Sequence, residues 1–158
     1  MKPDSEMLYL FIAKALRKTY ATLGVEEVVT NPDGFKELHF SEGELVYKDS
    51  YTGFFKSRGF EVVRYQDSPI WMCSYGGGMI KSEKSLAFET FTFLKKVFLA
   101  DTHGFKTFRG PQIFTDQNWK YTYTQKGDIS EFQGYEEIHV NNELIFFHNI
   151  IGGEIQEM

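Results

Sequence analysis

Two segments of this chain repeat the same pattern, and this similarity constrains the fold more than any other feature. Residues 59–80 and 134–155 align without a gap at a constant offset of 75 positions. The aligned pairs include Gly59 with Gly134, Phe60 with Tyr135, Glu61 with Glu136, Ile70 with Ile145, Trp71 with Phe146, and Gly77 with Gly152. A repeated segment predicts two structural halves, and the seam between two halves is a common place for a ligand pocket.

Composition sets the class of protein. Hydrophobic residues make up 42% and charged residues 25% of 158 residues, as in a soluble globular protein. Aromatic residues reach 17%, which favours strands. A net charge of −5 without a basic run argues against direct nucleic-acid binding. The single cysteine, Cys73, excludes an internal disulfide and fits a cytoplasmic location. Charges interrupt the apolar N-terminal residues, so we expect neither a signal peptide nor a membrane anchor.

Hydrophobic periodicity predicts the elements. Helical spacing of apolar residues predicts helices from Asp4 to about Tyr20 and from Ser82 to about Ala100. Alternation and turn residues predict strands at residues 44–51, 54–65, 70–75, 118–125, 130–140 and 144–150. We therefore predict an α+β fold: an internally duplicated unit of one helix and three antiparallel strands, giving about six strands and two helices around a pseudo-twofold axis. Residues 1–158 would form a single domain, with halves at about 1–80 and 81–158.

Alternation along the predicted strands sorts polar side chains onto the inner face. Two carboxylates, Glu61 and Glu136, head inner faces that are otherwise apolar. A buried carboxylate must be hydrogen-bonded, paired or protonated, because an unpaired buried charge costs several kcal/mol. Tyrosine hydroxyls or one of Arg58, Arg64 and Arg109 are the expected partners.

The inner faces together predict a polar and aromatic pocket of the kind that binds small molecules. Its candidate residues are Tyr47, Asp49, Tyr51, Glu61, Trp71, Tyr75, Arg109, Tyr121, Tyr123, Glu136 and His148. The alternative is that these tyrosines are core packing with hydroxyls satisfied at the rim, and that the glutamates cap strand ends or turns.

Motifs for metals and cofactors are not apparent. The four histidines have no ligand spacing, so we expect no metal site. The run Gly76-Gly77-Gly78 follows a strand but lacks the lysine and helix start of a nucleotide loop, and we expect a sharp turn or a close backbone approach there and no cofactor. Cys73 lies mid-strand and is expected to be a buried, inert thiol.

Several motifs resemble those of an uncharacterised bacterial family, domain of unknown function 5680. They are Gly34 to Leu38, Tyr47 to Gly53, Phe55 to Val63, Pro69-Ile70-Trp71, Phe108 to Pro111, Gly127-Asp128, and Phe132 to Ile138. Trp71-Met72 departs from the pattern, which has a further residue between Trp and Met. Some relatives place this domain behind a helix-turn-helix module, so the resemblance implies an effector-sensing or partner-binding domain. We expect no such module here, because the first helix leads directly into the repeat.

Three functions remain open. The first is a small-molecule-binding or sensing module, whose tyrosines and carboxylates would suit a cationic or aromatic ligand. The second is a hydrolase with Glu61 or Glu136 as base and Arg109 or Tyr121 stabilising negative charge. The third is a protein-interaction or homodimerisation domain. We favour the first, and whether the protein is an enzyme is left uncertain.

Overall fold

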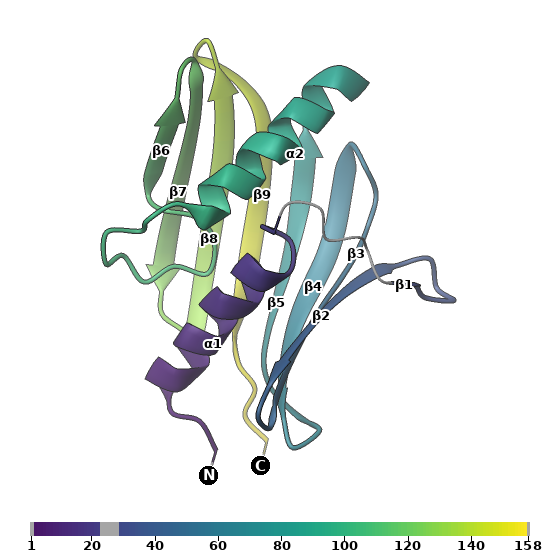
Figure 1. The fold of residues 1–158 in the computed structure, drawn as a ribbon, viewed down its shortest axis with the longest axis vertical. Coiled ribbons are helices and arrows are strands. Elements are labelled where there is room, and N and C mark those ends of the chain that lie inside the picture. The colour runs from purple at the N-terminus through teal and green to yellow at the C-terminus, as the bar shows by residue number, and fades with distance from the viewer. Residues whose placement is uncertain (1, 23–28, 158) are drawn as a thin grey trace.

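The strands of this protein form one antiparallel sheet, covered on one face by both helices (Figure 1). The computed structural model describes residues 2–22 and 29–157. Within them the strand order is β1-β2-β3-β4-β5-β9-β8-β7-β6. The strands are β1 (Val29–Thr30), β2 (Lys36–Glu42), β3 (Leu45–Thr52), β4 (Lys56–Tyr65), β5 (Ser68–Met79), β6 (Ile113–Asp116), β7 (Trp119–Gly127), β8 (Glu131–Val140) and β9 (Glu143–Glu154). Strands β5 and β9 pair at the middle of the sheet.

Helix α1 (Ser5–Lys18) begins at a side-chain cap, where the Asp4 carboxylate accepts a hydrogen bond of 2.8 Å from the Met7 N–H. Its apolar stripe, Leu8, Phe11, Ile12, Ala15 and Leu16, is buried against the sheet. At its C-terminal end Arg17 donates to the backbone oxygens of Leu99 and Ala100. This contact joins the last turn of α1 to the end of the second helix.

Helix α2 (Lys84–Leu99) crosses the same face of the sheet (Figure 1). It buries Ala87, Thr90, Phe93, Leu94, Val97 and Phe98. The predicted helices at about 4–20 and 82–100 are therefore confirmed to within a few residues. Neither described helix combines the length and apolar character that a membrane-spanning helix needs.

The predicted sheet of about six strands in two duplicated halves related by a pseudo-twofold axis is wrong. The structure has one continuous sheet of nine strands within the described residues. Two of the missed strands lie toward the edges: β2 is polar and buries only Leu38, and β6 has only four residues. Such strands carry too few alternating apolar residues to be recognised from sequence.

The central strands are also longer than predicted. Strand β5 continues to Met79 and β9 to Glu154, through glycines that were expected to form sharp turns or close backbone approaches. At Gly77 the φ angle is +154°, and a Cβ there would lie 2.0 Å from the Phe147 backbone oxygen. Of the two expectations for these glycines, a close backbone approach is therefore confirmed at Gly77, between β5 and β9, and a sharp turn is not.

Candidate functional site

A row of side chains crosses the sheet from β8 to β4. Glu136 lies opposite His148, His148 opposite Gly77, and Gly77 opposite Ser57. Paired residues in antiparallel strands project to the same face. Because Gly77 has no side chain, His148 and Ser57 meet across it, and the Ser57 Oγ lies 2.9 Å from the His148 Nε2. The register of four strands thus places these groups together.

A tight loop before β6 brings Arg109 to this row. The Thr107 hydroxyl accepts a hydrogen bond from the Arg109 N–H and donates to the Gly110 backbone oxygen. The Gly110 N–H donates to the Tyr121 hydroxyl at 3.2 Å. A Cβ on Gly110 would lie 2.5 Å from Val97, so only glycine fits between α2 and the loop. These contacts direct Arg109 into the interior.

The Arg109 guanidinium holds the two buried glutamates. It donates to both carboxylate oxygens of Glu136, at 3.2 and 2.8 Å, and to Glu61 at 3.4 Å. Such two-point contact is the strongest form of arginine–carboxylate pairing. Arg109 is therefore the partner that both glutamates require, and among the three arginines considered from sequence it is the one that supplies the contact.

Glu136 is ionised despite being fully buried. Burial alone would raise its pKa, but the charge of Arg109 and hydrogen bonding to His148 hold that pKa at about 2. The Tyr121 hydroxyl adds a hydrogen bond of 2.8 Å to the same carboxylate. Glu136 is thus a fixed anion at the β8 end of the row.

Glu61 and Asp49 lie opposite each other on β4 and β3. Their surroundings raise their pKa values, whereas those of Glu136 lower its pKa. Burial raises the pKa of Glu61, while Arg109 opposes this shift. Burial and the neighbouring Glu61 raise the pKa of Asp49 to about 8, although the Tyr75 hydroxyl donates to it at 2.8 Å. At neutral pH Asp49 is therefore mainly a neutral acid.

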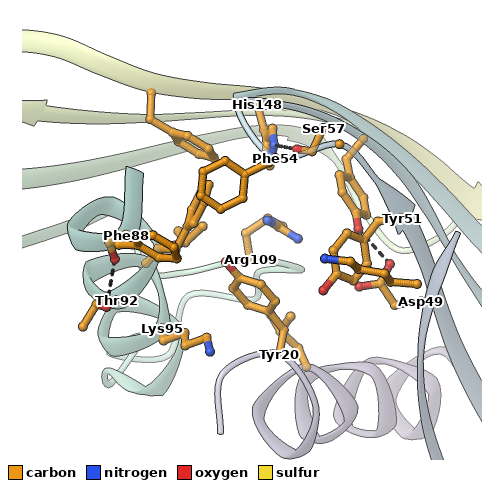
Figure 2. Close-up of a pocket in the computed structure, with 17 residues that line it drawn as sticks. Tyr20, Asp49, Tyr51, Phe54, Ser57, Phe88, Thr92, Lys95, Arg109 and His148 are labelled. Atoms are coloured by element: carbon orange, nitrogen blue, oxygen red, sulfur yellow. Dashed lines mark hydrogen bonds between the residues drawn. The ribbon is translucent and has the colours of Figure 1, made fainter. Parts of the chain in front are cut away.

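A pocket of about 380 Å³ opens between the helices and the first half of the sheet (Figure 2). Its lining residues are Leu16, Tyr20, Lys36, Asp49, Tyr51, Gly53, Phe54, Ser57, Tyr75, Phe88, Phe91, Thr92, Leu94, Lys95, Arg109, Phe146 and His148. Figure 2 shows the Arg109 guanidinium in the middle of these side chains, with α2 on one side and the strands on the other. The polar row thus forms part of the pocket floor.

Aromatic rings form the apolar wall. Phe54 stands 5.4 Å from both Phe88 and Phe91, measured between ring centroids, and Phe146 lies 4.6 Å from the His148 ring. Phe54 and Phe88 are 38% and 53% exposed, unlike the phenylalanines of the core. The wall therefore runs from exposed rings at the mouth to the histidine at the floor.

Lysines add positive charge to the lining. The Lys95 ammonium lies 5.7 Å from the centre of the Tyr20 ring, and the Lys36 ammonium lies 5.9 Å from that of Tyr51. Lys95 has no carboxylate partner in the part of the chain that the structure describes. Since Asp49 is mainly neutral, the lining is cationic at neutral pH.

The structure divides the eleven residues predicted to bind a ligand. Five of them line the pocket: Asp49, Tyr51, Tyr75, Arg109 and His148. The other six are core: Tyr47, Glu61, Trp71, Tyr121, Tyr123 and Glu136. Trp71, for example, is buried between Phe108 and Phe132 and donates its indole N–H to the Ile129 backbone oxygen.

Sequence reasoning missed the helix side of the pocket and Ser57. Phe88, Phe91 and Lys95 lie on α2 at helical spacing, which indicates a shared face but not what that face covers. The signal that could have found Ser57 is register, because aligning β4 with β5 places it opposite Gly77. No group of three or more His, Cys, Asp or Glu side chains within residues 2–22 and 29–157 is placed to hold a metal ion.

Comparison with known proteins identifies a family but no function. Residues 49–155 match the family model described as Domain of unknown function (DUF5680). No curated protein and no solved structure matches the chain. The matched segment includes the whole row from Ser57 to Glu136 and most of the pocket lining.

Proposed function

The chain belongs to this family of domains of unknown function, and we propose that it binds a small molecule with an aromatic or apolar body and an anionic group. The observation that carries this proposal is the pocket between α2 and the sheet, with phenylalanines on one wall and cations on the lining. Binding of this kind suits a sensing or sequestering protein.

The dimensions and wall of the pocket support a ligand of modest size. A volume of about 380 Å³ falls at the lower end of the range for small-molecule sites, roughly 300–1,000 Å³. Phe54, Phe88 and Phe91 present ring faces and edges against which a flat or branched apolar group would pack. The partial exposure of Phe54 and Phe88 means that a ligand would cover apolar surface that is otherwise in contact with water.

The charge of the lining favours an anion over the cation considered from sequence. Glu61 and Glu136 do not line the pocket and are paired with Arg109 behind it. The carboxyl group that does line it, Asp49, is mainly neutral at pH 7 because its pKa is raised to about 8. Lys95 therefore attracts an anionic group without competition from an ionised carboxylate among the described lining residues.

A matched set of ligands tests the charge preference. Benzoate, indole-3-acetate and phenylacetate would be compared by thermal shift and calorimetry with benzylamine and with the neutral amides of the same acids. Saturating binding at about 100 times the Kd would add about 2.7 kcal/mol of apparent stability. We expect the carboxylates to raise the melting temperature most, the amides less and the amine least.

Two lysines on the same helix provide the control. Lys95→Gln removes one of the cations that line the pocket, whereas Lys96→Gln removes a neighbouring lysine that pairs with Asp116 on the surface. We expect carboxylate affinity to fall about fivefold in Lys95→Gln, as for a lost exposed charge contact of about 1 kcal/mol, and to stay unchanged in Lys96→Gln. Equal affinities of wild type for acids and amines, or equal loss in both variants, would overturn the proposal.

A further inference from the structure

We propose that Ser57, His148 and Glu136 form a nucleophile–base–carboxylate relay that transfers the acyl group of small carboxylic esters. Three side chains from three strands are joined by two hydrogen bonds in the order that such chemistry requires. The Ser57 Oγ lies 2.9 Å from the His148 Nε2, and the His148 Nδ1 lies 3.0 Å from the Glu136 Oε1. Two of the three, Ser57 and His148, line the pocket.

The protonation of the row follows from the charge of Glu136. Its pKa of about 2 makes it an acceptor only, so the hydrogen of its bond to His148 sits on Nδ1. In a neutral imidazole the other nitrogen, Nε2, then carries a lone pair. Nε2 must therefore accept from the Ser57 hydroxyl, which is the orientation in which a histidine removes a proton from a serine.

The surroundings keep His148 neutral and able to act as a base. Burial lowers its pKa, and Glu136 opposes that shift by hydrogen bonding and charge. Arg109 from the loop before β6 and Arg58 from β4 lower the pKa further. The rings of Phe146 and Tyr75 pack beside it. At neutral pH the free imidazole is thus the main form.

Ser57 is placed for contact with a bound ligand. It is half-buried and lies on the pocket lining next to the aromatic wall, so an ester with an aromatic or branched apolar group could present its carbonyl carbon to the hydroxyl. Gly77 keeps the space between Ser57 and His148 open. The neighbouring donors on the lining are Arg109, which uses three of its five N–H groups on glutamates, and the neutral Asp49.

The step balances without a cofactor. The Ser57 Oγ bonds to the carbonyl carbon while its proton passes to the His148 Nε2, and the carbonyl oxygen becomes an anion. Collapse of this intermediate breaks the ester C–O bond, and the leaving alcohol takes the proton from His148. Water then hydrolyses the acyl-serine by the same route, releasing the acid. Glu136 is a positioning residue that orients and stabilises the imidazolium.

A covalent probe and a chromogenic ester test the relay directly. The purified chain would be treated with a fluorophosphonate, and adducts would be located by intact mass and peptide mapping. Hydrolysis of 4-nitrophenyl acetate and butyrate would be followed in parallel. We expect one adduct, on Ser57, and ester hydrolysis that Ser57→Ala abolishes. Ser74→Ala, which changes an exposed serine on β5, should leave both unchanged.

His148→Gln tests whether His148 acts as a base in ester hydrolysis or only stabilises the fold. It should lower kcat/KM for the ester at least about 100-fold while melting within a few degrees of wild type. In wild type the rate should rise from acid to neutral pH, with an inflection below the ordinary histidine value of 6.5. Absence of an adduct on Ser57, or a rate equal to that of Ser57→Ala, would overturn the relay. Carboxylate binding measured on the same samples shows independently whether the pocket binds a ligand.

Discussion

At the scale of single residues, Arg109 is the side chain on which the buried charges depend. It is the cation in contact with both Glu61 and Glu136, and the Phe98 ring packs 4.6 Å from its guanidinium carbon. Removing one member of a buried ion pair is costly because the remaining charge stays desolvated and unpaired. Without Arg109, Glu136 would keep only His148 and Tyr121 as partners among the described residues, and burial would raise its pKa.

We therefore expect Arg109→Met to lower the free energy of unfolding by about 3–5 kcal/mol, measured by urea denaturation at pH 7. Arg64→Met is the matched control, since Arg64 is half-buried on β4 and has no ion pair within the described residues; it should cost less than about 1 kcal/mol. Adding Glu136→Gln to Arg109→Met should restore part of the loss. Equal losses of unfolding free energy in Arg109→Met and Arg64→Met would contradict the assignment of Arg109 as the partner of the buried glutamates.

Asp49 predicts a dependence of stability on pH. Its pKa is about 8 in the folded chain and near 3.8 when unfolded, so between these values the folded state binds the proton and the unfolded state does not. Stability from this group is therefore greatest below about pH 4 and falls as pH rises to about 8, by at most about 1.4 kcal/mol per pH unit.

Asp49→Asn should remove this dependence while keeping an acceptor for the Tyr75 hydroxyl. We expect the variant to gain stability over wild type between pH 5 and pH 8, measured by urea denaturation at each pH. Asp33→Asn, in an exposed turn, should show a constant difference from wild type. A constant difference for Asp49→Asn as well would show that Asp49 ionises normally in the folded chain.

At the residue level, the sequence correctly predicted that Glu61 and Glu136 are buried and need partners, but it identified only part of the pocket lining. Alternation correctly placed Glu61 and Glu136 inside, and a buried carboxylate must have a partner, which made Arg109 a sound candidate. Glu61 and Glu136 occupy equivalent positions in the repeated segments. The structure gives them opposite pKa shifts, because Glu136 has a two-point contact with Arg109 and a hydrogen bond to His148, whereas Arg109 contacts Glu61 at one point. This difference between the two pKa values depends on the loop that carries Arg109 and on the pairing of β8 with β9. The residue pattern of a single strand shows neither.

At the scale of elements, the pairing of β5 with β9 determines how close Ser57 and His148 lie to each other. Gly77 holds a φ of +154° beside the Phe147 backbone, and any Cβ there would meet that oxygen at 2.0 Å. Gly76, one residue earlier, would place its Cβ against the flexible side chain of Arg58 instead. A side chain would therefore be tolerated differently at the two neighbouring positions, because it would meet backbone at Gly77 and a movable side chain at Gly76.

We expect Gly77→Ala to destabilise the chain by about 2 kcal/mol or more, through backbone strain and a displaced strand. Gly76→Ala should cost about 1 kcal/mol or less, since the Arg58 side chain can move. Urea unfolding measures both costs, and ester hydrolysis by the folded Gly77→Ala fraction reports the distance between Ser57 and His148. A Gly77→Ala variant as stable as Gly76→Ala would show that β5 and β9 are not this close.

Elements with strong hydrophobic periodicity could be predicted from the sequence. Segments whose structure depends on pairing with a neighbouring strand could not. Both helices followed from apolar residues at helical spacing, because each buries one stripe against the sheet. For the glycines of β5 and β9 the sequence left a sharp turn or a close backbone approach open, since local sequence does not reveal whether a second strand lies alongside. Strands β2 and β6 were missed because one is mostly polar and the other very short.

At the scale of the whole molecule, both helices lie on one face of the sheet (Figure 1). The pocket is lined by residues of both helices and of strands that include β3, β4, β5 and β9. Homodimerisation, expected as an alternative from the aromatic content, stays a prediction that sedimentation equilibrium would test. The position of the pocket between the helix layer and the sheet supports a ligand-binding role over a purely structural one.

The most direct test of this account is to map where an aromatic carboxylate binds by ¹H–¹⁵N NMR titration of the assigned chain. We predict that shifts on adding benzoate or indole-3-acetate cluster at Asp49, Phe54, Phe88, Lys95 and His148, saturate together, and need about fivefold more ligand for half-saturation in Lys95→Gln. Shifts confined to the opposite face of the sheet, or no saturable shifts at millimolar ligand with any of the carboxylates, would contradict the assignment of this pocket as the binding site.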